Sequence, residues 1–181
     1  MNKRRFLSVL VAVMVVCGSH AIGQQSLKDM VANEGFAWMA GSWKATTDEG
    51  QEIQLTYRWV AEGHALVLDF KMGEVVSHGM IYFASNGEKV VSVSVDNKGN
   101  VSNGTWDVEG AKVVLKNKTT NTNGETQEMA VCWSKIDSKT MKVELYGIKN
   151  GELSGEPWGT LEFKQQAKQS QKSEPKPAKA K

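Results

Sequence analysis

Glycine-bearing turns recur along the chain at short, regular intervals, and each separates two runs of alternating apolar and polar residues. The turns are Glu49-Gly50, Glu62-Gly63, Met72-Gly73, Asn86-Gly87, Lys98-Gly99, Glu109-Gly110, Asn123-Gly124, Asp137-Ser138 and Asn150-Gly151. Glycine supplies the positive φ that tight hairpin turns require. Parallel strands would need much longer crossover connections. The spacing therefore predicts an all-β protein whose strands pair antiparallel with their sequence neighbours.

Alternation inside these runs assigns an apolar face to most of the predicted strands. The strands are expected at residues 42–47, 52–60, 65–72, 75–84, 89–96, 101–108, 112–119, 127–136, 140–148 and 159–164. Their expected inward faces include Ile53, Leu55, Tyr57, Trp59, Leu66, Leu68, Phe70, Met72, His78, Met80, Tyr82, Val91, Val93, Val95, Trp106, Val108, Met129, Val131, Trp133, Met141, Val143 and Leu145. Closing the sheet on itself covers such a face and removes unpaired edges. We expect a single antiparallel up-and-down β-barrel of about ten strands at 36–164.

The N-terminal 21 residues have the pattern of a secretory signal peptide. A basic start is followed by an apolar run over 6–16 and by small residues at Ser19 and Ala21. The apolar run is shorter than the roughly 20 residues of a membrane span. Cys17 leaves open a lipoprotein alternative, although Val16 precedes it where a small residue is usual. We expect an exported protein, periplasmic or extracellular in a bacterium, with no transmembrane segment after signal removal.

The two segments that flank the predicted barrel differ from it in composition. Residues 22–35 carry Leu27, Met30 and Val31 at helical spacing, which predicts a short helical lead-in against the end of the barrel. Residues 165–181 are rich in Lys, Gln, Ser and Pro, which predicts a disordered tail. The tail is basic, whereas residues 24–163 hold 19 acidic and 13 basic side chains. An acidic domain and a tail without aromatics argue against nucleic-acid binding.

The start of the predicted barrel carries Gly41-Ser42-Trp43, a Gly-x-Trp after a helical turn. This motif resembles the entry of lipocalin and fatty-acid-binding (calycin) barrels, where the tryptophan packs across the barrel base. Further motifs resemble a bacterial family of single-domain barrels of uncharacterised function: Trp59-Val60 with Gly63, Gly79-Met80-Ile81-Tyr82, Val95-Asp96 with Gly99, and Gly104-Thr105-Trp106-Asp107 with Gly110. The resemblance implies a lipocalin-like fold and no established reaction. Haem-binding nitrobindin-like barrels use a late histidine, and none follows His78 here.

The expected inward faces bring aromatic side chains together with one histidine. We predict that these residues line a ligand site: Tyr57, Trp59, His78, Tyr82, Trp106 and Trp133. An inward histidine needs a hydrogen-bond partner, for which Tyr57 and Tyr82 are candidates. A satisfied structural histidine and a packed aromatic core are the alternatives.

The remaining chemistry-bearing residues predict neither a cofactor nor a metal. Cys132 is expected to be a small buried hydrophobe. Residues 96–100 match only half of a calcium loop and fit a hairpin turn. His64 is expected to be solvated in its turn. No nucleophile, zinc or phosphate-loop motif occurs in the chain.

Three functions are compatible with these features. The first is non-catalytic binding of a small apolar ligand in the barrel lumen. The second is a filled structural or interaction barrel in the cell envelope, with the basic tail as its contact element. The third is an enzyme in which His78 acts as acid or base, although no motif names a reaction.

Overall fold

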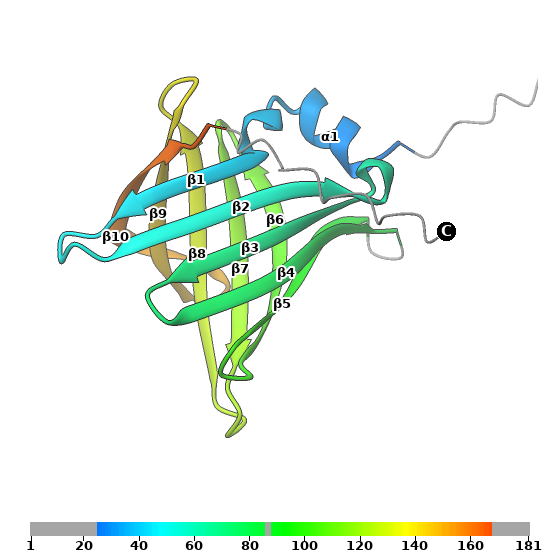
Figure 1. Ribbon diagram of the computed structural model, residues 1–181. Helices are drawn as coiled ribbons and strands as arrows, with labels where there is room; N and C mark the ends of the chain where they lie inside the picture. The colour runs from blue at the N-terminus through cyan, green and yellow to red at the C-terminus, as the bar shows by residue number, and fades with distance from the viewer. Residues whose placement is uncertain (1–24, 86–87, 168–181) are drawn as a thin grey trace, which may run out of the picture.

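The hairpin turns produce a closed antiparallel barrel in which each strand pairs with its sequence neighbours and β1 pairs with β10 (Figure 1). The computed structural model describes residues 25–85 and 88–167, so the predicted signal peptide and most of the predicted tail lie outside it. The strands are β1 Gly41–Thr46, β2 Glu52–Val60, β3 Ala65–Met72, β4 Val75–Ala84, β5 Lys89–Asp96, β6 Val101–Glu109, β7 Lys112–Thr120, β8 Thr126–Lys135, β9 Thr140–Lys149 and β10 Glu152–Gln165. The predicted all-β, ten-stranded up-and-down barrel is confirmed.

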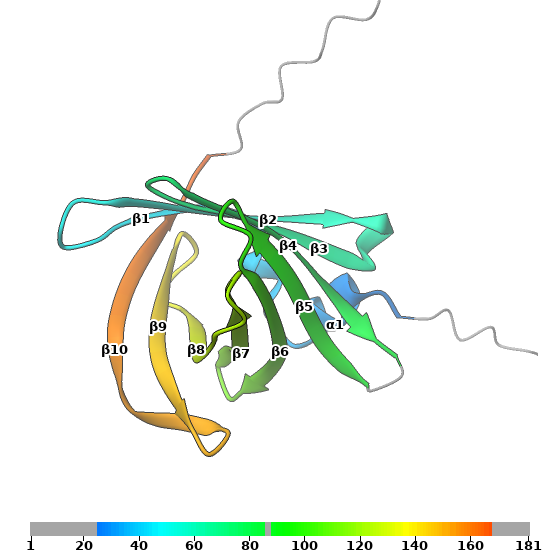
Figure 2. The ribbon, with the colours of Figure 1, turned by 90° about the horizontal axis from the view of Figure 1, so that it is seen from below.

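Two short helical segments precede the barrel and lie at one of its ends (Figures 1 and 2). Helix α1 spans Leu27–Asn33 and the 3-10 turn η1 spans Ala37–Met39, whereas a second 3-10 turn, η2 at Ala61–Gly63, connects β2 to β3. The Ser26 hydroxyl caps α1 by accepting a hydrogen bond from the backbone N–H of Asp29 at 3.2 Å. The expected helical lead-in is confirmed. No helix in the described residues is long and apolar enough to span a membrane.

Trp43 closes the end of the barrel beneath η1. Its side chain is almost fully buried, and its indole Nε1 donates a hydrogen bond to the Met39 carbonyl at 2.9 Å. Trp38 packs edge-on against it, with ring centroids 6.3 Å apart. Trp43 therefore fixes both the end of the core and the position of η1 above it.

The core lies inside the barrel and draws its larger side chains from β1, β2, β3 and β7 to β10. It includes Trp43, Ile53, Leu55, Tyr57, Leu66, Val113, Leu115, Trp133, Met141, Val143 and Phe163. Strand β10 begins earlier than the predicted residue 159, and its pairing with β9 shifts register between Ser154 and Gly159. The bulge lets a strand that contains Gly155 and Pro157 continue along β9.

The expected faces of β4 and β5 are wrong. The pairing of β3 with β4 places Ile81 beside inward Leu66, so His78, Met80 and Tyr82 point outward. By the same register Val91, Val93 and Val95 of β5 also lie outside, and Ser92 and Ser94 lie inside. In this wall of the barrel the apolar residues of each strand do not mark its inner face.

A second, smaller apolar cluster lies on the outside of β7, β8 and β9. Its members are Val114, Ala130, Cys132 and Tyr146, with Ile148 and Leu153 packed against them. Glu144 borders this cluster and pairs with Lys112 and Lys142, each at 2.9 Å. The hydrogen bond from the Lys142 ammonium group, and to a smaller extent that from Lys112, holds the pKa of the Glu144 carboxyl below its usual value.

Candidate functional site: a pocket beneath the N-terminal helix

A pocket of about 850 Å³ lies between α1, η1 and the adjoining ends of β2 to β7. Its roof is formed by Leu27, Met30, Val31, Phe36, Met39 and Ala40. Its apolar walls are Trp59, Leu66, Ile81, Phe83, Val90, Trp106, Val108 and Val113. Exposed charged side chains also border it: Glu34, Glu88, Lys89 and Asp107. An apolar, aromatic lining with a few polar groups is typical of small-molecule sites.

Two of the predicted site residues, Trp59 and Trp106, meet in this pocket. Trp59 is an inward residue of β2, and Trp106 is an inward residue of β6. The indole Nε1 of Trp106 donates to the Ser92 hydroxyl at 2.9 Å, which fixes the orientation of its ring. Because its N–H is already satisfied, Trp106 offers the pocket an apolar ring surface.

Trp133 and Tyr57 belong to the same interior but do not line the pocket. Trp133 of β8 stacks on Trp106, with centroids 5.0 Å apart and planes at 21°. The side chains of Trp133 and Tyr57 are buried. The Trp133 Nε1 and the Tyr57 hydroxyl have no hydrogen-bond partner among the described residues. Burial raises the pKa of the Tyr57 phenol far above its usual value, so the hydroxyl stays protonated.

His78 and Tyr82 lie outside the barrel, so the prediction that they line its lumen is wrong. The His78 side chain is 68% exposed, and its Nδ1 lies 2.7 Å from Asp69 Oδ1. Its partner is thus a carboxylate on the neighbouring strand rather than Tyr57 or Tyr82. An acid or base role for His78 inside the lumen has no support in this arrangement.

Sequence reasoning missed the roof and part of the wall as site residues. Phe83 and Val90 went unrecognised because the faces of β4 and β5 were reversed. The helical spacing of Leu27, Met30 and Val31 did indicate a lead-in packed on the barrel. It carried no sign that a space remains beneath that lead-in, because such a space depends on how far the roof stands from the strand ends.

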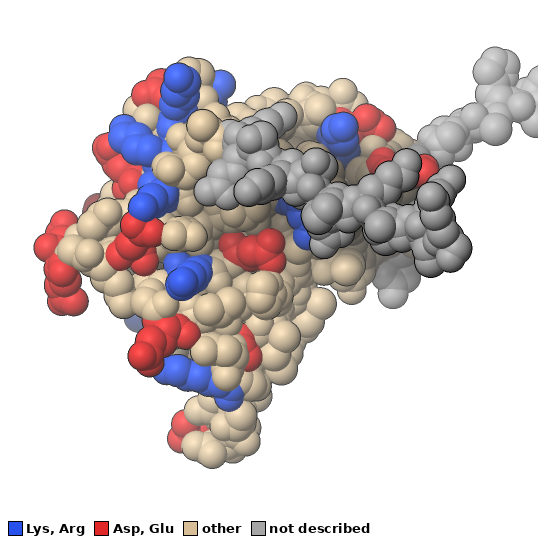
Figure 3. Space-filling model, viewed as in Figure 1, with Lys and Arg blue, Asp and Glu red and all other residues tan. Residues whose placement is uncertain are grey.

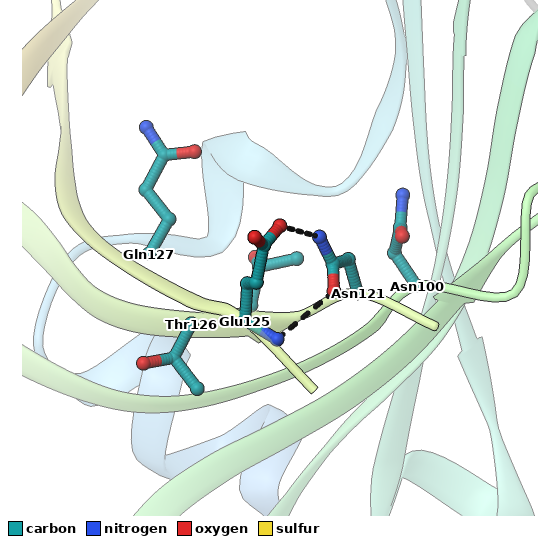
Figure 4. Close-up of a pocket in the computed structure, with 6 residues that line it drawn as sticks. Asn100, Asn121, Glu125, Thr126 and Gln127 are labelled. Atoms are coloured by element: carbon teal, nitrogen blue, oxygen red, sulfur yellow. Dashed lines mark hydrogen bonds between the residues drawn. The ribbon is translucent and has the colours of Figure 1, made fainter. Parts of the chain in front are cut away.

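A smaller polar hollow of about 310 Å³ lies at the β7–β8 hairpin (Figure 4). Asn121 organises this turn: its Oδ1 accepts from the backbone N–H groups of Asn123 and Glu125, and its Nδ2 donates to Glu125 Oε2 at 2.7 Å. The polar groups of the turn therefore form hydrogen bonds mostly with one another. The hollow is therefore explained by hairpin geometry.

The described residues contain no group of three or more His, Cys, Asp and Glu side chains that could hold a metal ion. Cys132 is buried, as expected, and burial raises the pKa of its thiol, which disfavours the reactive thiolate. His64 is exposed in its turn, also as expected. No protein-family model matches the chain, and no curated protein is significantly similar to it.

Proposed function

We propose that the protein is an exported, lipocalin-like barrel that binds a small, largely apolar molecule beneath α1 without catalysing a reaction. The observation that supports this function is the pocket of about 850 Å³ lined by Trp59 and Trp106. Its size lies within the range of about 300–1,000 Å³ that is typical of small-molecule sites. The site is displaced from the one expected from sequence, toward the helical end of the lumen.

The lining indicates how a ligand would be oriented. Apolar rings and aliphatic side chains contact its body, and the charged side chains Glu34, Glu88, Lys89 and Asp107 border the same pocket. A ligand with one polar end could keep that end hydrated near these groups while the rest leaves water. Burying apolar surface supplies about 25 cal/mol per Å².

Fluorescence titration with the neutral apolar probe N-phenyl-1-naphthylamine tests the site. Val108 and Val101 lie on β6 with 41% and 39% exposure, but only Val108 lines the pocket. Val108→Trp fills space in the pocket, whereas Val101→Trp adds the same side chain to the outer face. We expect the wild type and Val101→Trp to bind the probe and Val108→Trp to bind it about tenfold more weakly or worse. Absence of probe binding, or equal loss in both variants, contradicts the proposal.

The export component rests on the first 21 residues and has its own test. Intact-mass measurement on protein purified from its own host should give a chain that begins at Ile22. A chain that retains Met1 would overturn the export assignment and leave the pocket proposal in place.

A further inference from the structure

Two hydrogen-bond donors inside the barrel have no acceptor among the described residues. They are the Tyr57 hydroxyl and the Trp133 indole Nε1, whose side chains are 2% and 4% exposed. The Tyr57 hydroxyl keeps its proton, because burial raises the pKa of the phenol. An indole N–H only donates. Buried donors are nearly always paired, so two unpaired ones in the same interior call for an explanation.

Both donors lie next to the walls of the pocket beneath α1. Tyr57 is the inward residue of β2 that precedes the pocket wall Trp59. Trp133 pairs with Val113 across β7 and β8 and stacks on Trp106, and these two partners also line the pocket. The backbone on either side of each strand is already paired within the closed sheet. An acceptor for these donors must therefore come from a molecule inside the barrel, and the pocket is the cavity that adjoins them.

We infer that the ligand of this pocket is an uncharged molecule with a carbonyl-type oxygen at its deep end, which accepts hydrogen bonds from the Tyr57 hydroxyl and the Trp133 N–H. The inference rests on the proposed function and deepens it, because the apolar lining alone does not distinguish a hydrocarbon from a molecule with a buried polar group. A carbonyl oxygen has two lone pairs and accepts two hydrogen bonds. A ligand without an acceptor leaves both donors unpaired.

The surroundings of the two donors favour a neutral acceptor over a carboxylate. Their neighbours along and across the strands, on the inner face, are all uncharged: Gly41, Leu55, Trp59, Leu68, Trp106, Val113, Val131 and Val143. The charged side chains of the sheet lie on its outer surface, as Figure 3 shows over β1 and β2. A carboxylate beside these donors would be buried without a cation, which is strongly unfavourable.

The two lysines that border the pocket do not supply that cation. Lys89 is exposed at the start of β5. Lys116 points outward from β7, and its ammonium group donates to the Gly151 carbonyl at 2.8 Å. An anionic group on a ligand would stay near Lys89 in water, whereas the deep end of the pocket selects a neutral oxygen.

Displacement of bound N-phenyl-1-naphthylamine by three probes of similar shape tests the inference. Benzophenone carries a carbonyl, diphenylmethane has a methylene in its place, and diphenylacetate carries a carboxylate. We expect the wild type to bind benzophenone about three- to tenfold more tightly than diphenylmethane, and diphenylacetate about tenfold more weakly than benzophenone or worse. Tyr57→Phe and Trp133→Phe should each lower the ratio of benzophenone to diphenylmethane affinity about threefold. Tyr82→Phe removes a hydroxyl from the outer face and should leave this ratio unchanged.

The ratio separates the hydrogen bond from packing, because a reshaped pocket changes the binding of both probes and a lost donor changes only that of the ketone. Infrared spectroscopy gives a second readout: the carbonyl stretch of bound benzophenone should lie at lower frequency than in hexane and shift back in Tyr57→Phe. Equal affinity for the ketone and the hydrocarbon, a ratio that neither variant changes, or tighter binding of diphenylacetate would overturn the inference and leave the pocket in place. If neither N-phenyl-1-naphthylamine nor any of the three probes binds, the proposed function itself fails, and this inference fails with it.

Discussion

Opposite walls of this barrel distribute their side chains in opposite ways. In β9, β10, β1 and β2 most of the large apolar residues, such as Leu55, Val143 and Phe163, point inward, and Tyr146 and Ile148 of β9 belong to the outer cluster. Their outer surface carries ion pairs, among them Lys44 with Glu52 and Lys142 with Glu144. In β4, β5 and β6 the inward residues are mostly serine, glycine and a few larger side chains, and valines lie outside.

Space explains much of this difference. A Cβ added to Gly104 would lie 2.3 Å from Leu115 Cδ1 and 2.9 Å from Ser92 Oγ, so any side chain at this position requires Leu115 or Ser92 to shift. A Cβ on Gly79 would lie 2.7 Å from the Cβ of Ser94. Around Gly79 and Gly104 the inner surface of the β4–β6 wall therefore has small residues, because neighbouring side chains already fill the space there. The apolar residues of the same strands then remain for the outer surface.

Trp43→Ala should cause the largest loss of stability, because it removes the side chain that closes the core beneath η1. We expect the free energy of unfolding to fall by about 3–5 kcal/mol in urea denaturation. The control is Trp158→Ala, since Trp158 is 65% exposed and should change stability by less than about 0.5 kcal/mol. Equal losses in the two variants would contradict the core assignment.

Gly104→Ala tests the crowding inside the β4–β6 wall. The added methyl group must displace Leu115 or Ser92, so we expect a loss of about 1–3 kcal/mol. Asn103→Ala, one residue earlier on the exposed side of β6, should cost less than about 0.5 kcal/mol. A Gly104→Ala variant as stable as the wild type would show that this inner surface is loosely packed.

Glu144→Gln tests the charged wall, because Glu144 pairs with Lys142 and Lys112. The folded-state pKa lies below the ordinary 4.5, so the carboxylate stabilises the fold at neutral pH. This contribution is complete above about pH 4.5 and is lost as pH falls through the folded-state pKa. We expect a loss of about 1 kcal/mol at pH 7 that fades below about pH 4.

Thermal or urea unfolding from about pH 3 to pH 7 measures this difference. Glu162→Gln is the control, because its pair with Lys164 at 3.7 Å is well exposed and contributes little. If Glu144→Gln lowers the free energy of unfolding by the same amount at every pH, Glu144 stabilises the fold through packing and not through its charge.

Tyr57→Phe should have the smallest effect. The hydroxyl is buried without a partner in the described residues, so its removal should leave stability unchanged or raise it by up to about 1 kcal/mol. Tyr82→Phe, on the exposed outer face, serves as the control and should be neutral. A loss above about 1 kcal/mol in Tyr57→Phe alone would reveal a bound acceptor for this hydroxyl.

The strands and the closure of the barrel were predictable because both depend on local signals. Glycine turns mark the hairpins, and nearly every strand begins and ends within one residue of its predicted position. The start of β10 was missed because Gly155, Pro157 and the register shift interrupt its alternation.

The inner face of β4 and β5 was not predictable by the same rule. Alternation separates Val91, Val93 and Val95 from Ser92 and Ser94, but it does not say which set points inward. That choice is made by the register with β3 and β6, in which Ile81 lies beside Leu66 and Val90 beside Trp106. Strands with a clearly charged second face, such as β2 and β9, were assigned correctly.

Thiol labelling along β5 tests most directly which of its side chains point into the barrel and which point out. In a chain whose own cysteines are replaced, single cysteines at positions 92, 93, 94 and 95 are treated with a maleimide dye under native conditions. Cysteines in place of Val93 and Val95 should react about tenfold faster than those in place of Ser92 and Ser94, because only the first pair is exposed outside the barrel. The opposite alternation, with fast labelling at 92 and 94, would contradict both the proposed pocket wall and the outward orientation of Val93 and Val95.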